Sequence, residues 1–486
     1  MVVRDGVSAK LALTTEAPMV LAVLLVFALL APRTAAVSSG EVFVRPGDDL
    51  DTVAQSSPEG TRIILTAGEY RMQSIRPRRG QSFIGEVDSR TGRPLAVLNG
   101  SRLLTEFERE GRLFVARGQR QQGQARGSCR PDWPRCMFPE DLFFDGVSLK
   151  HVASKNAVVP GTFFFDYDAD AIYIAEDPTG HKVETSVLAV AFHPSASGVT
   201  IRNLVVEKYA TPAGSGAILA GVGWLVAGNE IRWNHGGGIW LGSDSRAVGN
   251  HVHHNGQAGV FSNSSVGAVF EENEIAFNGG LGFSAGWECG GSKFVRTRAL
   301  VVRRNWVHDN YCAGLWTDGY NLETTYEGNV VENNETFGIL HEISYAATII
   351  GNTVRRNGSA GIAISNSRNV RVLGNEVIVG AGRGDGIVII HAQRRDMGGP
   401  YGLLEARDNL VEGNVVVHEG RAGVSGLRAS VDRERIGGWN NRFVRNRYVV
   451  REAGVLHWIW LRQMSFEEFV QANEDSGSTL EVRGRP

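Results

Sequence analysis

The middle of the chain repeats one pattern of polar and apolar positions. Each copy has an asparagine, an apolar residue two positions later, a second asparagine five positions on, and a glycine four positions further that precedes another apolar residue. The first asparagines are Asn229, Asn250, Asn273, Asn305, Asn329 and Asn352. The second are Asn234, Asn255, Asn278, Asn310, Asn334 and Asn357, and the glycines are Gly238, Gly259, Gly282, Gly314, Gly338 and Gly361.

The usual step of this repeat, 21 to 24 residues, predicts a solenoid of stacked β coils. It is too short for two helices with their turns, but it fits three short strands and three turns. Each coil is expected to bury the apolar residue after the glycine against its neighbours, and the asparagines are expected to stack in ladders at turns. We expect the glycines to serve tight turns. The inward row is predicted to be Ile239, Val260, Phe283, Leu315, Ile339 and Ile362.

This repeat resembles that of the right-handed parallel β-helix superfamily, which has the pectate-lyase-like fold. The stretch from Gly47 to Tyr70 looks like the opening of such proteins, a short helix followed by the first strand, and 142–151 and 161–184 look like hairpins of an inserted subdomain. Ser465 and Glu468 have capping-box spacing and predict a short helix near the end. The predicted fold is all-β: a right-handed parallel β-helix solenoid with an N-terminal helical cap, an inserted β-hairpin subdomain and a C-terminal cap helix.

The predicted organisation has five parts: an export signal over 1–36, a cap with the first coils over 37–110, the inserted subdomain over 111–195, the repeats over 196–450 and a C-terminal cap over 451–486. The signal combines Arg4 and Lys10 with an apolar core from Met19 to Ala31 and small residues near Ala36. That core is short for a membrane span, which needs about 20 residues. We expect cleavage, or else an uncleaved N-terminal anchor as the one membrane contact; either alternative makes the body secreted or extracytoplasmic.

The charge and the cysteine content of the chain limit the classes of partner and the compartment that we expect. The 486 residues carry a formal net charge of −2 without a long basic run, which argues against nucleic acid and anionic membranes as main partners. Four cysteines suit an oxidising compartment: Cys129 and Cys136 bracket a short loop, and Cys289 and Cys312 are the other expected pair, although the sequence allows three connectivities. The spacing is not that of a zinc site. The expected state is a monomer.

Two steps of the repeat are too long. The step from Asn273 to Asn305 contains "GWECGGSKF". Weaker copies of the repeat follow at Asn375 and Asn414, and the step between them contains "HAQRRDMGGPYGLLEARD". Insertions in a solenoid project as loops from one face, which is often the binding face. The first insertion therefore predicts that a loop, and not the repeating core, places Glu288 and Lys293.

Alternation along each strand, counted from the repeat glycine, predicts which side chains share the outward face. Asp318 and Glu342 fall at equivalent outward positions of adjacent coils, roughly 4.8 Å apart. The same numbering brings Trp316 beside them, with Glu288 approaching from the previous coil, and places His341 inward. The candidate catalytic residues are Lys293, Glu288, Asp318, Glu342 and His341, and the candidate substrate-binding residues are Trp240, Trp287, Trp316 and Asp244.

Each of these residues also has a structural interpretation. A tryptophan can pack under a loop, Asp318 precedes Gly319 in a turn signal, His341 fits a core histidine, and Lys293 fits a solvated surface. His253, His254 and His308 lie before the second asparagine of their coils, and the outward ones are interpreted as surface residues.

Carboxylates, a lysine and aromatic side chains on one face of a solenoid favour an extracellular polysaccharide as partner. The first hypothesis is cleavage of a uronate-containing glycan by β-elimination with Lys293 as base, where Asp318, Glu342 and Glu288 can instead hold Ca²⁺. The second is a glycoside hydrolase that uses Asp318 and Glu342. The third is a non-catalytic glycan-binding or structural solenoid. The chain lacks the Asp-Pro-His-Asp motif of β-helical alginate epimerases, and no subfamily motif matches.

Overall fold

We describe the protein from a computed structural model, which describes residues 40–395, 397–475 and 477–484. The predicted export signal, 1–36, lies outside the described residues. In the described ranges, no helix is both long and apolar enough to span a bilayer.

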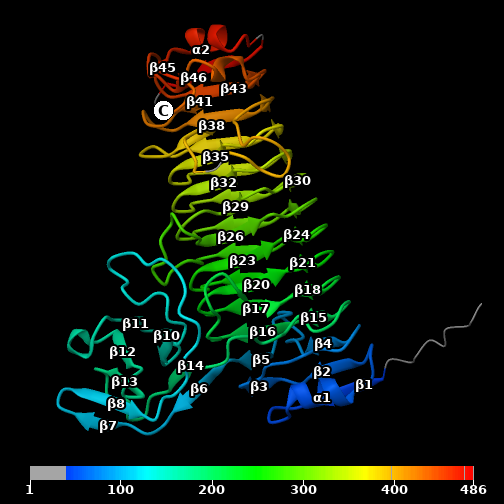
Figure 1. The fold of residues 1–486 in the computed structure, drawn as a ribbon, viewed down its shortest axis with the longest axis vertical. Helices are drawn as coiled ribbons and strands as arrows, with labels where there is room; N and C mark the ends of the chain where they lie inside the picture. The colour runs from blue at the N-terminus through cyan, green and yellow to red at the C-terminus, as the bar shows by residue number, and fades with distance from the viewer. Residues whose placement is uncertain (1–39, 396, 476, 485–486) are drawn as a thin grey trace, which may run out of the picture. The chain divides into compact units, whose positions relative to one another are not determined.

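Three long sheets run along a stack of coils, and a regular coil contributes one strand to each of the three sheets (Figure 1). Apart from β45, their strands pair in parallel, as a solenoid requires. The first sheet contains β1 (Glu41–Val44), β2 (Arg62–Leu65), β4 (Ser82–Gly85), β15 (Thr200–Arg202), β18 (Leu225–Ala227), β21 (Arg246–Val248), β24 (Val269–Glu271), β27 (Val301–Arg303), β30 (Thr324–Glu327), β33 (Ala347–Ile350), β36 (Val370–Leu373), β39 (Leu410–Glu412) and β42 (Arg442–Val444).

The other two sheets of the stack follow the same order. The second contains β3 (Gly68–Arg71), β5 (Ala96–Asn99), β16 (Leu204–Glu207), β19 (Glu230–Arg232), β22 (His251–His253), β25 (Glu274–Ala276), β28 (Trp306–His308), β31 (Val330–Glu332), β34 (Thr353–Arg355), β37 (Glu376–Val379), β40 (Val415–His418), β43 (Arg447–Val450) and β46 (Thr479–Val482). The third contains β17 (Gly216–Leu219), β20 (Gly237–Leu241), β23 (Ala258–Asn263), β26 (Gly290–Val295), β29 (Leu315–Asp318), β32 (Phe337–Glu342), β35 (Ala360–Ser365), β38 (Asp385–His391), β41 (Ser425–Ala429), β44 (Trp458–Trp460) and β45 (Gln463–Met464).

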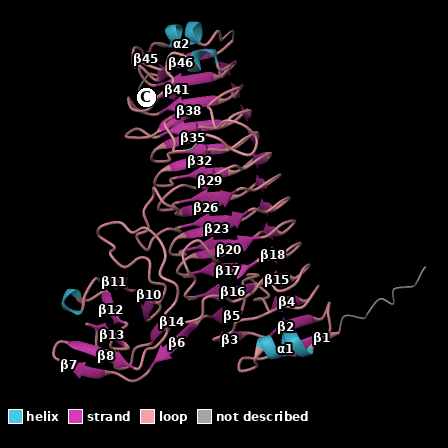
Figure 2. Cartoon of the chain, in the orientation of Figure 1, coloured by secondary structure: helices cyan, strands magenta, loops and turns pink. Residues whose placement is uncertain are grey.

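Helices close the two ends of the stack (Figure 2). The helix expected in the opening is α1 (Leu50–Ser56), where the Asp49 side chain accepts from the backbone N–H groups of Asp51 and Thr52. The helix expected at the end is α2 (Phe466–Ala472), with the capping box of Ser465 and Glu468 in place. Its Phe469 is fully buried, so α2 covers the apolar interior of the last coil. Two short 3₁₀ turns are η1 (Lys155–Ala157) and η2 (Ile436–Gly438).

The inserted subdomain consists of two small sheets. One contains β6 (Ser101–Leu104), β9 (Leu142–Phe144), β10 (Val147–Ser148) and β14 (Val183–Ser186), and the other β7 (Glu108–Glu110), β8 (Leu113–Arg117), β11 (Lys150–His151), β12 (Thr162–Asp166) and β13 (Ala171–Ile174). Because β6 pairs with β14, the subdomain begins before residue 111, where the sequence placed its start. Its longest connection, residues 118–141, reaches the coil stack, as described below.

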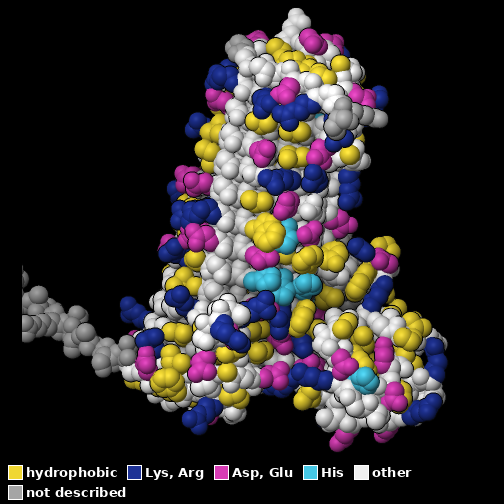
Figure 3. Space-filling model, turned by 180° about the vertical axis from the view of Figure 1, so that it is seen from behind, with side chains coloured by type: hydrophobic (Ala, Val, Ile, Leu, Met, Phe, Trp, Pro, Cys, Tyr) yellow, Lys and Arg dark blue, Asp and Glu magenta, His cyan; other side chains and the backbone are white. Residues whose placement is uncertain are grey.

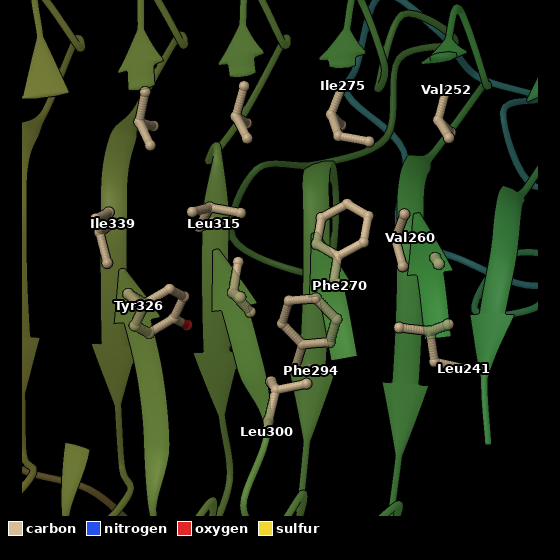
Figure 4. Close-up of a cluster of buried hydrophobic side chains, with 14 of the residues drawn as sticks. Leu241, Val252, Val260, Phe270, Ile275, Phe294, Leu300, Leu315, Tyr326 and Ile339 are labelled. Atoms are coloured by element: carbon tan, nitrogen blue, oxygen red, sulfur yellow. The ribbon is translucent and has the colours of Figure 1, made fainter. Parts of the chain in front are cut away.

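The interior of the stack combines an apolar core with two asparagine ladders. Large side chains from all three sheets, among them Phe270, Phe294 and Tyr326, fill the space between them (Figure 4). In the ladders, the side chain of Asn305 donates to the amide oxygen of Asn329 at 2.9 Å, and each rung repeats this contact with the next coil. These bonds satisfy buried backbone groups as well, which is why the asparagines recur.

The repeat glycines have a different function from the one predicted. Gly338 lies within β32, where a Cβ would come within 2.6 Å of the Asn357 amide nitrogen and 2.6 Å of the Gly361 carbonyl oxygen. The glycine is therefore required by the close approach of the ladder, and not by a tight turn.

In one coil, the sequence pattern identifies the wrong glycine as the repeat glycine. Val260 pairs with Ser292, so the repeat glycine of that coil is Gly291, and Gly282 belongs to the insertion that precedes β26. Phe283 consequently lies outside the main core, in a separate cluster. Lys293 lies within strand β26, contrary to the prediction that a loop carries it.

Buried histidines predict that acid destabilises the fold. Burial lowers the pKa of His341 to about 4 and that of His418 to about 3, so both are neutral in the folded chain at pH values where an unfolded histidine takes up a proton. The stability from His341 is present above about pH 6.5 and falls as the pH drops towards 4, by roughly 2 kcal/mol between pH 7 and pH 5. Chemical unfolding at both values should show this loss, and His341→Gln should reduce it. An equal pH dependence in the variant would contradict the assignment.

Candidate functional site

A pocket of about 520 Å³ opens on the outward face of the third sheet, over β29, β32, β35 and β38. Its lining is mostly apolar and aromatic, with two carboxylates, one guanidinium and two hydroxyl groups among the polar side chains. The lining residues are Ala285, Gly286, Trp287, Ala313, Trp316, Asp318, Thr336, Phe337, Leu340, Glu342, Ile343, Ser365, Ile390 and Arg394.

Lys293 and Asp318 form an ion pair at the edge of this pocket. Lys293 Nζ donates to Asp318 Oδ2 at 2.6 Å and lies 3.1 Å from the ring centroid of Trp316. The lysine side chain is 2% exposed and that of Asp318 25%. Burial lowers the pKa of Lys293, while the neighbouring carboxylate of Asp318 opposes the shift. The second oxygen of Asp318, Oδ1, is buried and has no hydrogen-bond partner in the described part of the chain.

Glu342 follows Asp318 on the next coil and has its own cationic partner. Since Thr317 pairs with His341, the outward residues Asp318 and Glu342 after them are in register, as the sequence predicted. Glu342 Oε1 is paired with Arg394, and Glu342 Oε2 accepts from Trp316 Nε1 at 3.2 Å. The glutamate side chain is 15% exposed.

Arg394 reaches the site from the loop after β38. Its Nη2 also donates to Ser365 Oγ at 3.0 Å, and its Nε lies 3.4 Å from Asn366 Oδ1. The sequence marked this segment as an insertion on the binding face but did not single out Arg394, because a charge in a loop carries no periodic signal.

A second wall comes from the insertion before β26 and from the subdomain. The backbones of Cys129 and Phe283 form an isolated antiparallel β-bridge. Next to it, Ser284 N–H donates to the Ser128 carbonyl at 2.8 Å. Trp287, which lines the pocket, stacks on Phe283 with 6.1 Å between ring centroids.

Two disulfides hold this wall in place. The structure pairs Cys129 with Cys136 inside the subdomain loop and Cys289 with Cys312 between the insertion and the next coil. The Cα atoms are 5.5 and 5.6 Å apart. Both pairs belong to one buried cluster, so the covalent links and the packing fix the same wall.

Glu288 stands beside the ion pair but does not line the pocket. Burial raises the pKa of its carboxyl, and the positive charges of Lys293 and Arg126 partly oppose this. Its backbone carbonyl accepts from Gln257 Nε2 at 2.8 Å. Glu288 therefore contributes to the electrostatics around Lys293 and Asp318, and its loop position agrees with the sequence.

Three of the predicted site residues lie elsewhere. His341 points into the core, where Nε2 donates to the Tyr345 carbonyl and Nδ1 accepts from Thr317 Oγ1, each at 2.7 Å. Trp240 is on the pocket's sheet but on β20, three strands before β29, and lies against Phe261. Asp244 is an exposed turn residue with a φ of 54° and does not line the pocket.

The carboxylates do not suit Ca²⁺. Two of the three carboxylates expected to hold Ca²⁺ already have a cationic partner, because Asp318 is paired with Lys293 and Glu342 with Arg394. Within the described ranges, no group of three or more His, Cys, Asp or Glu side chains is arranged to hold a metal ion. The residues present therefore do not fit a Ca²⁺ site.

Comparisons with known proteins agree with the fold. Residues 215–377 match the family model described as "Right handed beta helix region". The structure is similar to that of XylC in complex with xylose, with a TM-score of 0.66, 14% identity and coverage of 91% of this chain and 86% of that one. It is also similar to the A-module of the mannuronan C-5 epimerase AlgE6 from Azotobacter vinelandii, with a TM-score of 0.52, 13% identity and coverage of 90% and 93%. No curated protein matches the sequence.

Proposed function

Because the chain is a right-handed parallel β-helix with an aromatic pocket on one sheet, we propose that it is a polysaccharide-active enzyme, and specifically a glycoside hydrolase that retains the anomeric configuration. In this proposal the protein is a secreted or extracytoplasmic monomer. Its partner is an extracellular polysaccharide. These points on partner and location rest on the sequence of the export signal and on the shape of the site.

The unpartnered oxygen of Asp318 carries the proposal. A buried carboxylate oxygen without a donor is costly, and the one on Asp318 belongs to a residue that lines the pocket. Lys293 holds the other oxygen, so Oδ1 is the atom available to a substrate once the Asp318 side chain turns to expose it to the pocket.

We propose retention because the strand register places Asp318 and Glu342 on adjacent coils. Asp318 and Glu342 are in register on adjacent strands, which lie about 4.8 Å apart. Retaining glycosidases use carboxyl groups about 5–5.5 Å apart, whereas inverting enzymes need room for a water molecule between them. In the proposed reaction, Asp318 attacks the anomeric carbon while Glu342 gives its proton to the departing oxygen. Glu342 then takes a proton from the water that releases the sugar from Asp318.

For Glu342 to act as the acid, its ion pair with Arg394 must open. Arg394 comes from a loop, whereas Glu342 belongs to β32. The pair can therefore open when a sugar enters, without disturbing the sheet.

β-Elimination, the first hypothesis from the sequence, becomes the second candidate. The lowered pKa of Lys293 favours it, because a neutral amine is the form that a base requires. The geometry favours hydrolysis, because Lys293 is 2% exposed and directs Nζ to Asp318 and Trp316. In the hydrolytic proposal, Lys293 is a positioning residue for Asp318.

Product analysis separates the two candidates. The protein, without its predicted signal, would be incubated with polymers that contain xylose, glucose, mannose or uronic acid, and with aryl glycosides of the same sugars. We expect reducing ends to increase without ultraviolet absorbance from unsaturated products. A parallel increase of both signals would support elimination and contradict hydrolysis. If neither signal rises with any substrate, the non-catalytic alternative replaces the proposal.

A further inference from the structure

A second group of aromatic side chains lies away from the pocket, on the outward face of the second sheet and on the turn that follows it. These side chains occupy four consecutive coils, at β19, β22, β25 and β28. We call them the ring strip: Trp233, His251, His253, His254, Phe277, Trp306 and His308. Figure 3 shows histidine side chains gathered on one face of the stack, with hydrophobic side chains beside them.

The rings of the last three coils contact one another. Within strands, His251 stacks on His253 with 4.0 Å between centroids, and Trp306 stacks on His308 with 3.9 Å. Between coils, Phe277 lies 5.0 Å from the His254 ring and 5.7 Å from that of His308. From His251 to His308, the strip is therefore a continuous surface of ring faces and edges.

The strip is costly for the fold, which argues for a function. Trp233 and Phe277 have φ values of 53° and 56°, a left-handed conformation that aromatic side chains of this size rarely adopt. The next two coils have Asp309 and Asn333 at this turn position, which are residues suited to it. Phe277 is 38% exposed and Trp306 45%, so these rings do not fill the core. Exposed apolar groups that gather in this way mark binding surfaces.

The polar groups of the strip indicate the chemical class of the ligand. Glu230 lies 3.3 Å from His253 Nε2, Glu274 lies 3.3 Å from His308 Nε2, and Glu332 accepts from Trp306 Nε1 at 2.9 Å. Carboxylates at the margin of apolar rings suit hydroxyl donors above a C–H face, which is the pattern of a sugar ring. Because Glu230 is also paired with Arg232, repulsion of a polyanion such as a uronate polymer would come from Glu274 and Glu332.

The strip is long and follows the coil axis. His251 and Trp306 occupy equivalent positions two coils apart, a distance of roughly 9.6 Å. An elongated chain can therefore contact both, whereas a single sugar can contact only one.

We propose that the ring strip is a second glycan-binding surface, which holds a neutral polysaccharide chain along the stack of coils. The identity of the polymer rests on the proposed function, since the enzyme is expected to hold the polymer that it cleaves. The surface itself does not depend on turnover.

The test measures binding and turnover separately. Wild-type protein and the double variant Phe277→Ala/Trp306→Ala would be mixed in the cold with insoluble xylan, cellulose and mannan, and with alginate gel beads. The bound fraction is measured at increasing polymer concentration. We expect the wild type to bind a neutral polymer, and the variant to need about tenfold more of it, as for the loss of two aromatic anchors. Turnover of a soluble aryl glycoside should be unchanged.

The control variant is Phe43→Ala, which removes another exposed ring, 65% accessible, from the first strand and should bind as the wild type does. Thermal unfolding would verify that all variants are folded. Equal binding by the double variant, binding to alginate alone, or no binding of the wild type to the three neutral polymers would overturn the proposal. Absence of glycoside turnover with loss of binding in the double variant would contradict the proposed function alone.

Discussion

Replacing Asp318 with asparagine should lower glycoside turnover by about 10⁴-fold or more, the range seen when a covalent nucleophile is lost. The amide is nearly isosteric with the carboxylate, so it should retain a contact with Lys293 and leave the pocket's shape unchanged. What it removes is the negative charge that faces the anomeric carbon. Initial rates on an aryl glycoside, measured with thermal unfolding, would separate loss of chemistry from loss of fold.

Two further variants test whether the loss of activity is specific to the proposed carboxylates. Asp168→Asn changes an exposed aspartate of the inserted subdomain and should leave the rate unchanged. Azide added to Glu342→Ala should restore turnover of substrates with good leaving groups, because azide can replace the water that Glu342 would activate. Asp318→Asn with a near wild-type rate would show that the reacting carboxylate lies elsewhere.

Asn310→Ala should destabilise the fold by about 4 kcal/mol, since it leaves several buried groups of neighbouring coils without partners. The Asn310 side chain accepts from both nitrogens of Asn278, at 3.1 and 3.0 Å. It donates to the amide oxygen of Asn334 at 2.9 Å and to two backbone carbonyls. One substitution thus interrupts the ladder in both directions, in the middle of the stack.

Chemical unfolding of the variant and of Asn263→Ala would measure this effect. Asn263 is an exposed asparagine at the end of β23, so its replacement should change the stability by less than about 0.5 kcal/mol. Equal effects of the two substitutions would mean that the ladder does not stabilise the interior. A loss of cooperativity in Asn310→Ala, without a shift of the midpoint, would also contradict the prediction.

The solenoid could be predicted because the physical requirement repeats in every coil. A buried amide ladder needs an asparagine at the same place each time, and the adjacent glycine is needed to make room for it. Such positions stand out in a single sequence. The register of Asp318 beside Glu342 could be predicted from the repeat, because the step between their coils has the usual length.

The register of the Lys293 coil could not be predicted in the same way. Both Gly282 and Gly291 precede apolar or small residues, and Gly282 has the usual spacing from Asn278. The structure selects Gly291 because the segment around Gly282 packs against Trp133 and Cys129 of the subdomain. Contacts between segments so distant in sequence leave no periodic signal.

The sequence does not predict the contribution of Arg394 or the burial of Lys293, because both depend on contacts outside the repeat. Arg394 lies 52 residues after Glu342, in a loop whose path the sequence does not fix. Lys293 was identified as a candidate, but its burial against Trp316 follows from the corrected register. That burial changes its expected role from base to positioning residue.

In the proposed mechanism, Asp318 forms a covalent bond with a sugar. The most direct measurement is mass spectrometry of the protein after incubation with a 2-deoxy-2-fluoro glycoside of the sugar that product analysis identifies, followed by peptide mapping. The proposal predicts a mass increase of one fluorosugar on the peptide that contains Asp318, and none in Asp318→Asn. Turnover of that sugar's glycosides without a trapped adduct, or with the label on another residue, would contradict it.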